Sequence, residues 1–149
     1  MLILRKFTIQ DAPFLQKHRQ GMSLQEAEQL ITDWNSGLFQ GKYFEMYAIL
    51  ADDSNGEIVG TVSLYEHTST AVSPGIEIIK EYRGKGYGTE GMKSALAIAA
   101  ENGWKIAISQ VRTDNVPSLR LHKSLDFEIA DEYINKKGNR VYCLLKSLV

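Results

Sequence analysis

The feature that most constrains this chain is a glycine-rich stretch, residues 81–91, that joins two apolar segments. The segment before it, residues 76–79, is mostly β-branched and predicts a strand, whereas the apolar residues after it recur at helical spacing. Glycines at a helix start leave backbone N–H groups unshielded, and the helix dipole favours negative charge at that end. Arg83 and Lys85 add positive charge beside these groups. The stretch therefore predicts an anion cradle suited to a pyrophosphate.

The spacing of these glycines fits more than one phosphate-binding pattern. No P-loop pattern, Gly-x-x-x-x-Gly-Lys-Ser/Thr, occurs in the chain. Gly86, Gly88 and Gly91 match the dinucleotide fingerprint, and Asp114 follows at about the spacing of a ribose-binding acid. That fingerprint normally follows its strand directly and opens a domain, whereas only 58 residues follow Gly91 here. Dinucleotide binding is therefore the last of the hypotheses.

A second reading of the same glycines is Arg83-x-x-Gly86-x-Gly88, which resembles the acyl-CoA pyrophosphate loop of the GCN5-related N-acetyltransferase (GNAT) superfamily. Residues 115–127 are similar to the family's Asn-x-x-Ala/Ser-x-x-x-Tyr-x-x-x-Gly-Phe segment, and they begin 27 residues after Gly88. That separation leaves room for one helix and one strand, as the family requires. Two linked motifs are more specific than either alone, and the resemblance implies acetyl-CoA as cosubstrate.

The resemblance also implies which residues bind acetyl-CoA. They lie at the end of the predicted strand, in the glycine-rich loop and at the start of the second motif: Ile78, Ile79, Arg83, Gly84, Lys85, Gly86, Tyr87, Gly88, Thr89 and Asn115. The Asn115 side chain would bind the pantetheine or phosphate region of CoA, cap its own helix, or do both. No metal site is predicted.

Acetyl transfer to an amine needs a group that accepts the amine proton, and Glu77 is the first candidate for this base. It is the only acid within the predicted central strand. The alternative is that Glu77 faces solvent or pairs with a cation. Glu66, Glu128 and Asp114 remain open as other carboxylates. No covalent nucleophile is expected, because Cys143 lies in an apolar segment.

His122 occupies the position of the Tyr that the family often uses to protonate the departing thiolate. An imidazolium can donate a proton near neutral pH, so His122 is the predicted acid. The alternative is a histidine that only packs against the pantetheine arm. A histidine in the pattern Ser-x-x-Leu-His is similar to the phosphinothricin-acetyltransferase-like branch of the family.

Periodicity and turn signals predict the order βααβββαβαββ. The elements are a strand over 2–8, helices starting near 11 and 23, strands 43–50 and 57–65, a loop 68–75, strand 76–79, helix 87–102, strand 105–112, a helix from 115, and strands 127–133 and 140–145. Asp11 and Ser23 are the predicted caps of the first two helices. The fold class is α/β (α+β), and the resemblance implies a mixed, mostly antiparallel sheet of about six or seven strands with helices on both faces.

Composition adds limits on organisation and partners. A length of 149 residues predicts one domain, 1–149, and a formal net charge of −1 predicts neither nucleic acid nor an anionic membrane as partner. A single cysteine excludes an internal disulfide, and Arg5 and Lys6 interrupt the apolar start, so no signal peptide is expected. The predicted location is the cytoplasm. A homodimer is the assembly to consider.

The function implied by the resemblance is transfer of acetyl from acetyl-CoA to the primary amine of a small molecule, by direct attack in a ternary complex. Acetylation of a protein N-terminus or a lysine is a second enzymatic hypothesis. A non-catalytic acyl-CoA-binding module is a third, because it would keep the glycine-rich loop while losing the acid and the base.

Overall fold

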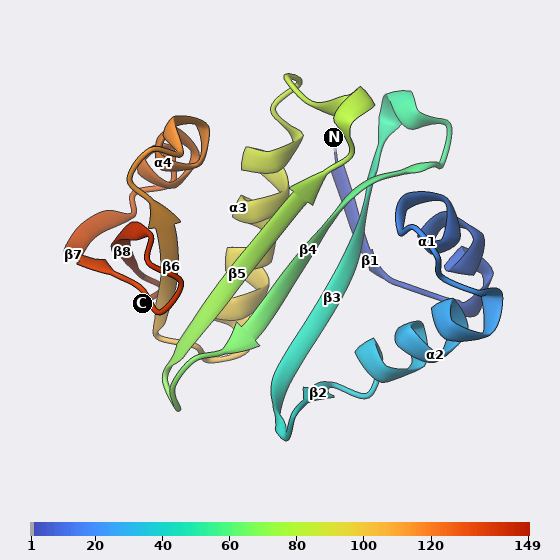
Figure 1. Ribbon diagram of the computed structural model, residues 1–149, viewed down its shortest axis with the longest axis horizontal. Coiled ribbons are helices and arrows are strands. Elements are labelled where there is room, and N and C mark those ends of the chain that lie inside the picture. The colour runs from blue at the N-terminus through green and yellow to red at the C-terminus, as the bar shows by residue number, and fades with distance from the viewer. Residues whose placement is uncertain (1) are drawn as a thin grey trace.

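A single mixed sheet runs through the molecule in the computed structural model, which describes residues 2–149 (Figure 1). The strands are β1 (Leu2–Lys6), β2 (Leu38–Phe39), β3 (Lys42–Ala51), β4 (Ile58–Glu66), β5 (Ala71–Ile78), β6 (Ile106–Arg112), β7 (Glu128–Ile134) and β8 (Arg140–Ser147). The α-helices are α1 (Ala12–His18), α2 (Leu24–Trp34), α3 (Tyr87–Glu101) and α4 (Val116–Ser124). The strand order is β1-β3-β4-β5-β6-β8-β7, with the short β2 paired to β3.

The sheet is mostly antiparallel, and β5 and β6 form its parallel pair. The predicted fold class and the order of the main elements are confirmed; β2 is an addition that the sequence did not suggest. A mostly antiparallel sheet is not the doubly wound parallel sheet of a dinucleotide-binding domain, so that hypothesis is wrong.

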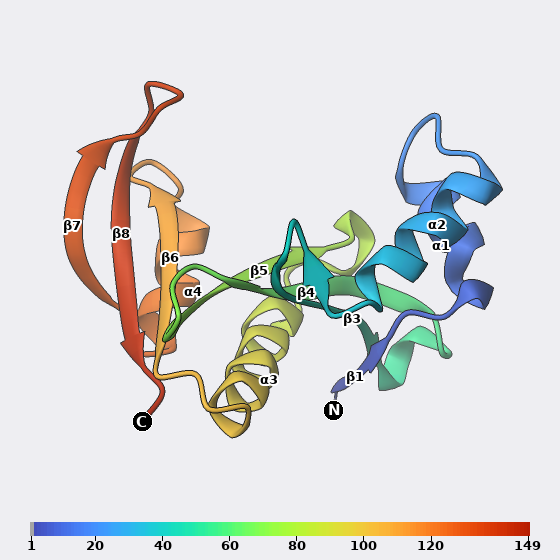
Figure 2. The same cartoon turned by 90° about the horizontal axis from the view of Figure 1, so that it is seen from below.

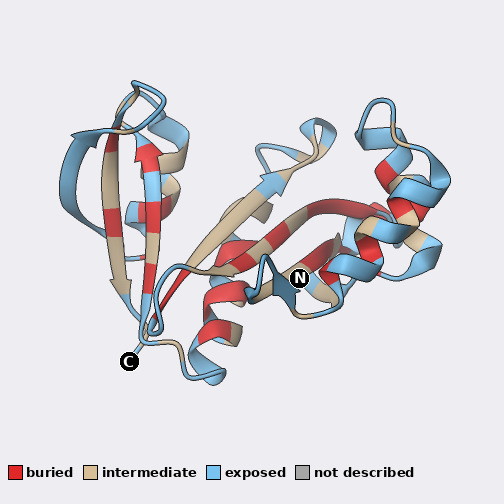
Figure 3. Cartoon of the chain, turned by 60° about the horizontal axis from the view of Figure 1, so that its bottom comes forward, coloured by how far each residue is buried: buried red, intermediate tan, exposed pale blue. Residues whose placement is uncertain are grey.

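Helices cover both faces of the sheet, as predicted: α3 lies on one face and α1 with α2 on the other (Figure 2). Side chains of a strand alternate between faces, and β3 follows this rule. Tyr47 and Ile49 join the core cluster beneath α3, together with Ala95 of that helix. Ala48, between them, joins the cluster beneath α1 and α2, together with Ile31. Figure 3 shows the buried residues concentrated along these central strands and the inner faces of the helices.

The sheet splits between β5 and β6. These strands pair only at Ala71 with Ile106 and at Val72 with Ala107, and then they diverge (Figure 1). From Ser73 onward, β5 is paired to β4, and no strand among residues 2–149 pairs with its other edge. Backbone groups on that edge are therefore available to a ligand.

The start of β5 corrects the prediction of a loop over residues 68–75. Pro74 and Gly75 are typical turn residues, yet both lie within β5, opposite Leu64 and Ser63 of β4. A proline is tolerated in a strand that has a free edge. A Cβ at Gly75 would lie 2.8 Å from Ser63 Oγ, so the glycine allows β4 and β5 to approach closely.

Two of the predicted helix caps are present. Ser23 Oγ accepts a hydrogen bond from Glu26 N–H at 3.0 Å, and the Glu26 carboxylate accepts one from Ser23 N–H at 3.1 Å. This capping box satisfies donors that the first turn of α2 would otherwise leave unpaired. Asn115 Oδ1 accepts a hydrogen bond from Ser118 N–H at 3.3 Å and caps α4.

Asp11 occupies the N-cap position of α1, as predicted, but its side chain makes no capping hydrogen bond to that helix. Instead the carboxylate accepts two hydrogen bonds from the Arg5 guanidinium, at 2.8 and 3.0 Å, and one from Thr8 N–H at 2.8 Å. The Asp11 carboxylate therefore binds the Arg5 guanidinium on β1 instead of the N–H groups at the start of α1.

None of the helices within residues 2–149 combines the length and the apolar character needed to cross a membrane.

Candidate active site

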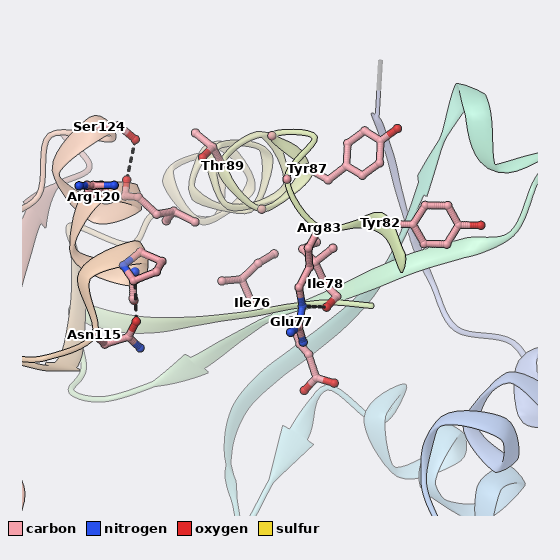
Figure 4. Close-up of a pocket in the computed structure, with 16 residues that line it drawn as sticks. Ile76, Glu77, Ile78, Tyr82, Arg83, Tyr87, Thr89, Asn115, Arg120 and Ser124 are labelled. Atoms are coloured by element: carbon pink, nitrogen blue, oxygen red, sulfur yellow. Dashed lines mark hydrogen bonds between the residues drawn. The ribbon is translucent and has the colours of Figure 1, made fainter. Parts of the chain in front are cut away.

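A cavity of about 810 Å³ occupies the opening where β5 and β6 diverge. Its walls are the end of β5, the loop leading into α3, and one face of α4 (Figure 4). This volume lies within the range typical of sites for small molecules and cofactors. The lining includes most of the predicted residues, namely Glu77, Ile78, Arg83, Gly84, Gly86, Tyr87, Gly88, Thr89 and Asn115.

The glycine-rich loop presents backbone to this cavity. Gly84 and Gly86 adopt φ values of 81° and 82°, which favour glycine, and nothing lies within 4 Å of a Cβ built on either residue. Gly86 is the N-cap of α3, so the unpaired N–H groups of the first helical turn follow it directly. Gly88 already lies within the helix. The geometry fits the predicted anion cradle.

The two loop cations have different roles. Arg83 Nε donates a hydrogen bond to the Ile78 carbonyl at 2.9 Å, which holds its side chain at the end of β5. Lys85 does not line the cavity; its Nζ pairs with Asp53 at 3.1 Å. The Tyr87 hydroxyl also donates to Asp53, and this hydrogen bond raises the pKa of Tyr87 to about 12. Lys85 therefore anchors the loop to the β3–β4 connection rather than facing a ligand there.

Glu77 lies where the cavity meets a second one. It is opposite Thr61 of β4, and its carboxylate points toward the side of the sheet that carries α1 and α2 (Figure 4). The second cavity, of about 210 Å³, lies on that side and is lined in part by Phe14 and Arg19. Both cavities share three lining residues: Glu77, Ile78 and Arg83. Ile79 lines only the cavities on the α1 side, and its N–H is bonded to the Val59 carbonyl at 2.9 Å.

The other candidate carboxylates lie away from the cavity. Glu66 accepts a hydrogen bond from Tyr43 N–H at 3.3 Å, and Asp114 pairs with Arg112 at 2.9 Å. Glu128 is an exposed residue of β7. Within residues 2–149, Glu77 is the only acid that lines the larger cavity.

His122 lies in the protein core instead of lining the cavity. It is 5% exposed, and its ring packs edge-on against Phe127 with 4.8 Å between centroids. Nδ1 lies 2.7 Å from the Ser118 carbonyl, and the buried Nε2 has no hydrogen-bond partner. In this arrangement His122 is therefore not positioned to protonate a thiolate held in the cavity or to touch a pantetheine arm there. A packing role fits its position.

The neutral state of His122 leads to a prediction about stability. Burial lowers its pKa below the ordinary value, so the unfolded chain binds a proton more readily than the folded chain. The free energy of unfolding should consequently fall as the pH drops below about 6.5 toward the lower folded pKa. Denaturant titrations at pH 7.5 and 5.5 should show a smaller pH-dependent loss in His122→Leu than in the wild type. Exposed His67 provides a control: His67→Gln should retain the wild-type loss. An equal loss in His122→Leu would contradict the prediction.

Several residues of the α4 wall were not predicted from sequence. Pro117, Arg120, Leu121 and Ser124 line the cavity alongside Asn115. They recur three or four positions apart, so they share one face of α4. That spacing could have identified them once Asn115 was assigned to the helix start.

The sheet opens at its parallel pair, β5 and β6, and the glycine-rich start of α3 lies at this opening. This arrangement agrees with the fold that the two sequence motifs imply. Residues 1–128 match the family described as the acetyltransferase (GNAT) domain. Because this match spans most of the 149 residues, the chain belongs to that family.

Individual relatives agree with the family at the level of fold. A spermidine N-acetyltransferase from Vibrio cholerae, in complex with CoA and spermine, superposes with a TM-score of 0.78 over 99% of this chain and 95% of that one, at 16% identity. RimL, a ribosomal L7/L12 alpha-N-protein acetyltransferase, superposes with a TM-score of 0.77 over 99% of this chain and 93% of that one, at 19% identity.

A curated relative is the L-methionine sulfoximine/L-methionine sulfone acetyltransferase of Pseudomonas paraeruginosa (strain DSM 24068 / PA7). It is 27% identical over 100 residues, which are 63% of this chain. The match spans 58% of that relative's length.

Proposed function

We propose that the protein is an acetyl-CoA-dependent N-acetyltransferase that acetylates the primary amine of a small molecule. The observation that carries this proposal is the meeting of two cavities at Glu77. The larger has an anion cradle and a free strand edge for CoA. The smaller gives a second molecule access to the same carboxylate from the opposite side of the sheet. Family membership supports acetyl-CoA as the donor.

The chemistry follows from these positions. The pyrophosphate of acetyl-CoA binds at the first turn of α3, and its pantetheine arm lies along the free edge of β5. Glu77 accepts a proton from the acceptor ammonium, directly or through water. The free amine then attacks the thioester carbonyl carbon, a C–N bond forms, the C–S bond breaks, and the nitrogen releases its remaining extra proton to solvent to give the neutral amide. Holding both substrates together supplies much of the remaining acceleration.

The departing thiolate takes its proton from solvent in this proposal. Two phenols line the larger cavity, and both already donate hydrogen bonds to carboxylates: Tyr82 to Glu57 at 3.1 Å, and Tyr87 to Asp53. The hydrogen bond to Glu57 also raises the pKa of Tyr82. Neither phenol is therefore poised to act as an acid.

The charges around the smaller cavity favour an amine that also carries a carboxylate. The residues that line it include two acids, Glu77 and Glu81, and four basic residues, His18, Arg19, Lys80 and Arg83. A polyamine is cationic along its length and would meet those bases unfavourably, whereas an amino acid analogue can pair with both signs. The relative that acts on L-methionine sulfoximine and L-methionine sulfone supports this class of acceptor.

Ligand-dependent melting and a thiol-release assay test the proposal. Acetyl-CoA and CoA should raise the melting temperature, because a ligand that binds only the native state stabilises it by mass action. Thiol release should then appear with amino acids or their analogues, L-methionine sulfoximine included, and be weaker with spermidine. A melting curve unmoved by millimolar CoA but shifted by NAD would overturn the proposal.

The same assay separates the alternatives. Thiol release only with peptides would indicate acetylation of protein N-termini or lysines. Stabilisation by CoA without thiol release from any amine would indicate a non-catalytic acyl-CoA-binding module.

A further inference from the structure

A groove adjoins the larger cavity and is lined by α3, the end of α4 with the two residues after it, and residues 146–149 at and after the end of β8. It has a volume of about 540 Å³ and shares Thr89 and Ser124 with the cavity. The charged residues that line the groove are Lys93, Asp126 and Lys146. Two open spaces therefore lead away from the glycine-rich loop: the cavity along β5, and the groove between α3 and the end of α4.

Arg120 is the cation of the cavity lining that lies on the α4 side. Arg83, the other cation in that lining, is bonded to the Ile78 carbonyl, and Lys85 pairs with Asp53 outside the cavity. Among residues 2–149, the exposed Arg120 guanidinium makes no hydrogen bond or ion pair. Its five donors remain available to a ligand.

The neighbouring hydroxyl does not compete for this role. Ser124 Oγ donates its hydrogen to the Leu121 carbonyl at 2.7 Å. It therefore has no proton to offer an anion on the α4 side. Within residues 2–149, the one acid that lines the cavity is Glu77, and it belongs to the opposite wall, on β5. Among the described residues, the α4 side of the cavity lining therefore carries Arg120 and no carboxylate, and Asp126, the acid of the adjoining groove, follows the end of α4.

We propose that Arg120 binds the 3′-phosphate of CoA and so selects CoA over donors that lack this group. The inference rests on the proposed function. With the pyrophosphate at the first turn of α3 and the pantetheine arm along β5, the adenosine end leaves the loop in the other direction, over α3 and α4. A guanidinium matches phosphate in shape and charge and can bind it with two parallel hydrogen bonds.

The test compares acetyl-CoA with acetyl-3′-dephospho-CoA, which differs only by the phosphate. In the wild type, kcat/KM should be about tenfold higher for acetyl-CoA, the size expected of one charge-assisted contact at a partly exposed site. In Arg120→Gln this ratio should fall to about twofold, through a higher KM for acetyl-CoA at unchanged kcat. The wild-type ratio should also shrink at high salt, because exposed charges are screened.

Two matched variants complete the design. Lys123 lies on the same helix but lines neither the cavity nor the groove, so Lys123→Gln should keep the wild-type ratio. Lys93 lines the groove only, and Lys93→Gln should keep it as well. Loss of the ratio in Lys93→Gln instead of Arg120→Gln would overturn the assignment, as would equal use of both donors by the wild type.

Failure of the proposed function would look different from failure of this inference. A protein that transfers acetyl from neither donor lacks the activity, yet its affinities for CoA and 3′-dephospho-CoA can still be compared by calorimetry. A preference for CoA that disappears in Arg120→Gln would support the inference in that case too. A preference that persists would overturn it.

Discussion

Glu77→Gln is expected to lower kcat by ~10²–10⁴-fold while leaving CoA affinity nearly unchanged. Glutamine keeps the shape of the side chain at the junction of the two cavities but cannot accept the amine proton. The defect should shrink as the pH rises, because free amine then becomes plentiful without a base. Steady-state rates from pH 6 to 10, with CoA affinity measured by calorimetry, check both parts.

The neighbouring strand offers a matched control for this variant. Glu66 of β4 was also a candidate base, but it accepts a hydrogen bond from Tyr43 N–H and does not line the larger cavity. Glu66→Gln should therefore retain kcat within about threefold, in line with a carboxylate outside the chemistry. A Glu77→Gln defect that is the same at every pH would leave Glu77 a structural role.

Gly88→Val is expected to weaken CoA binding by ~10²-fold or more, equivalent to the loss of roughly two charge-assisted hydrogen bonds. A Cβ at this position would lie 3.4 Å from Leu121 Cδ1 and 3.7 Å from Ile78 Cγ1, between the α4 wall and β5. The added methyl groups of valine would fill the space in front of the N–H groups that face the anion. Calorimetry with CoA measures the loss.

The fold should tolerate this change. Gly88 does not have a positive φ, and valine has a better helix propensity than glycine. The unliganded melting temperature should therefore stay close to that of the wild type. Gly88→Ala, which adds only the Cβ, should weaken binding less. Wild-type CoA affinity in a folded Gly88→Val protein would show that the pyrophosphate lies elsewhere.

The parts of the site that sequence predicted are those set by local chemistry. A glycine at φ 82° before α3 and an asparagine cap before α4 depend on a few neighbouring residues, so their spacing revealed them. The same holds for the Ser23 capping box. Glu77 was found because the strand that contains it could be recognised.

The parts that sequence missed depend on distant partners. Lys85 is turned from the cavity by Asp53, which lies 32 positions earlier in the chain. Pro74 belongs to a strand because β4 pairs with it, although its own residue type predicts a turn. His122 matches a motif position, but it follows the cavity-lining Leu121 by one residue, and this step of about 100° around α4 turns its ring into the core.

The position of β8 between β6 and β7 determines when the site can form during synthesis. On the ribosome, β6, α4 and β7 emerge before the strand that joins them. Leu144 of β8 is part of the core cluster that also holds Phe127 and Leu125, so this cluster cannot close until β8 has been made. The first five strands and α3 precede β6 in the sequence and therefore emerge earlier. A nascent chain thus exposes the β5 wall and the glycine-rich loop before it has β8, and CoA can be enclosed between the β5 and α4 walls only once β8 has emerged.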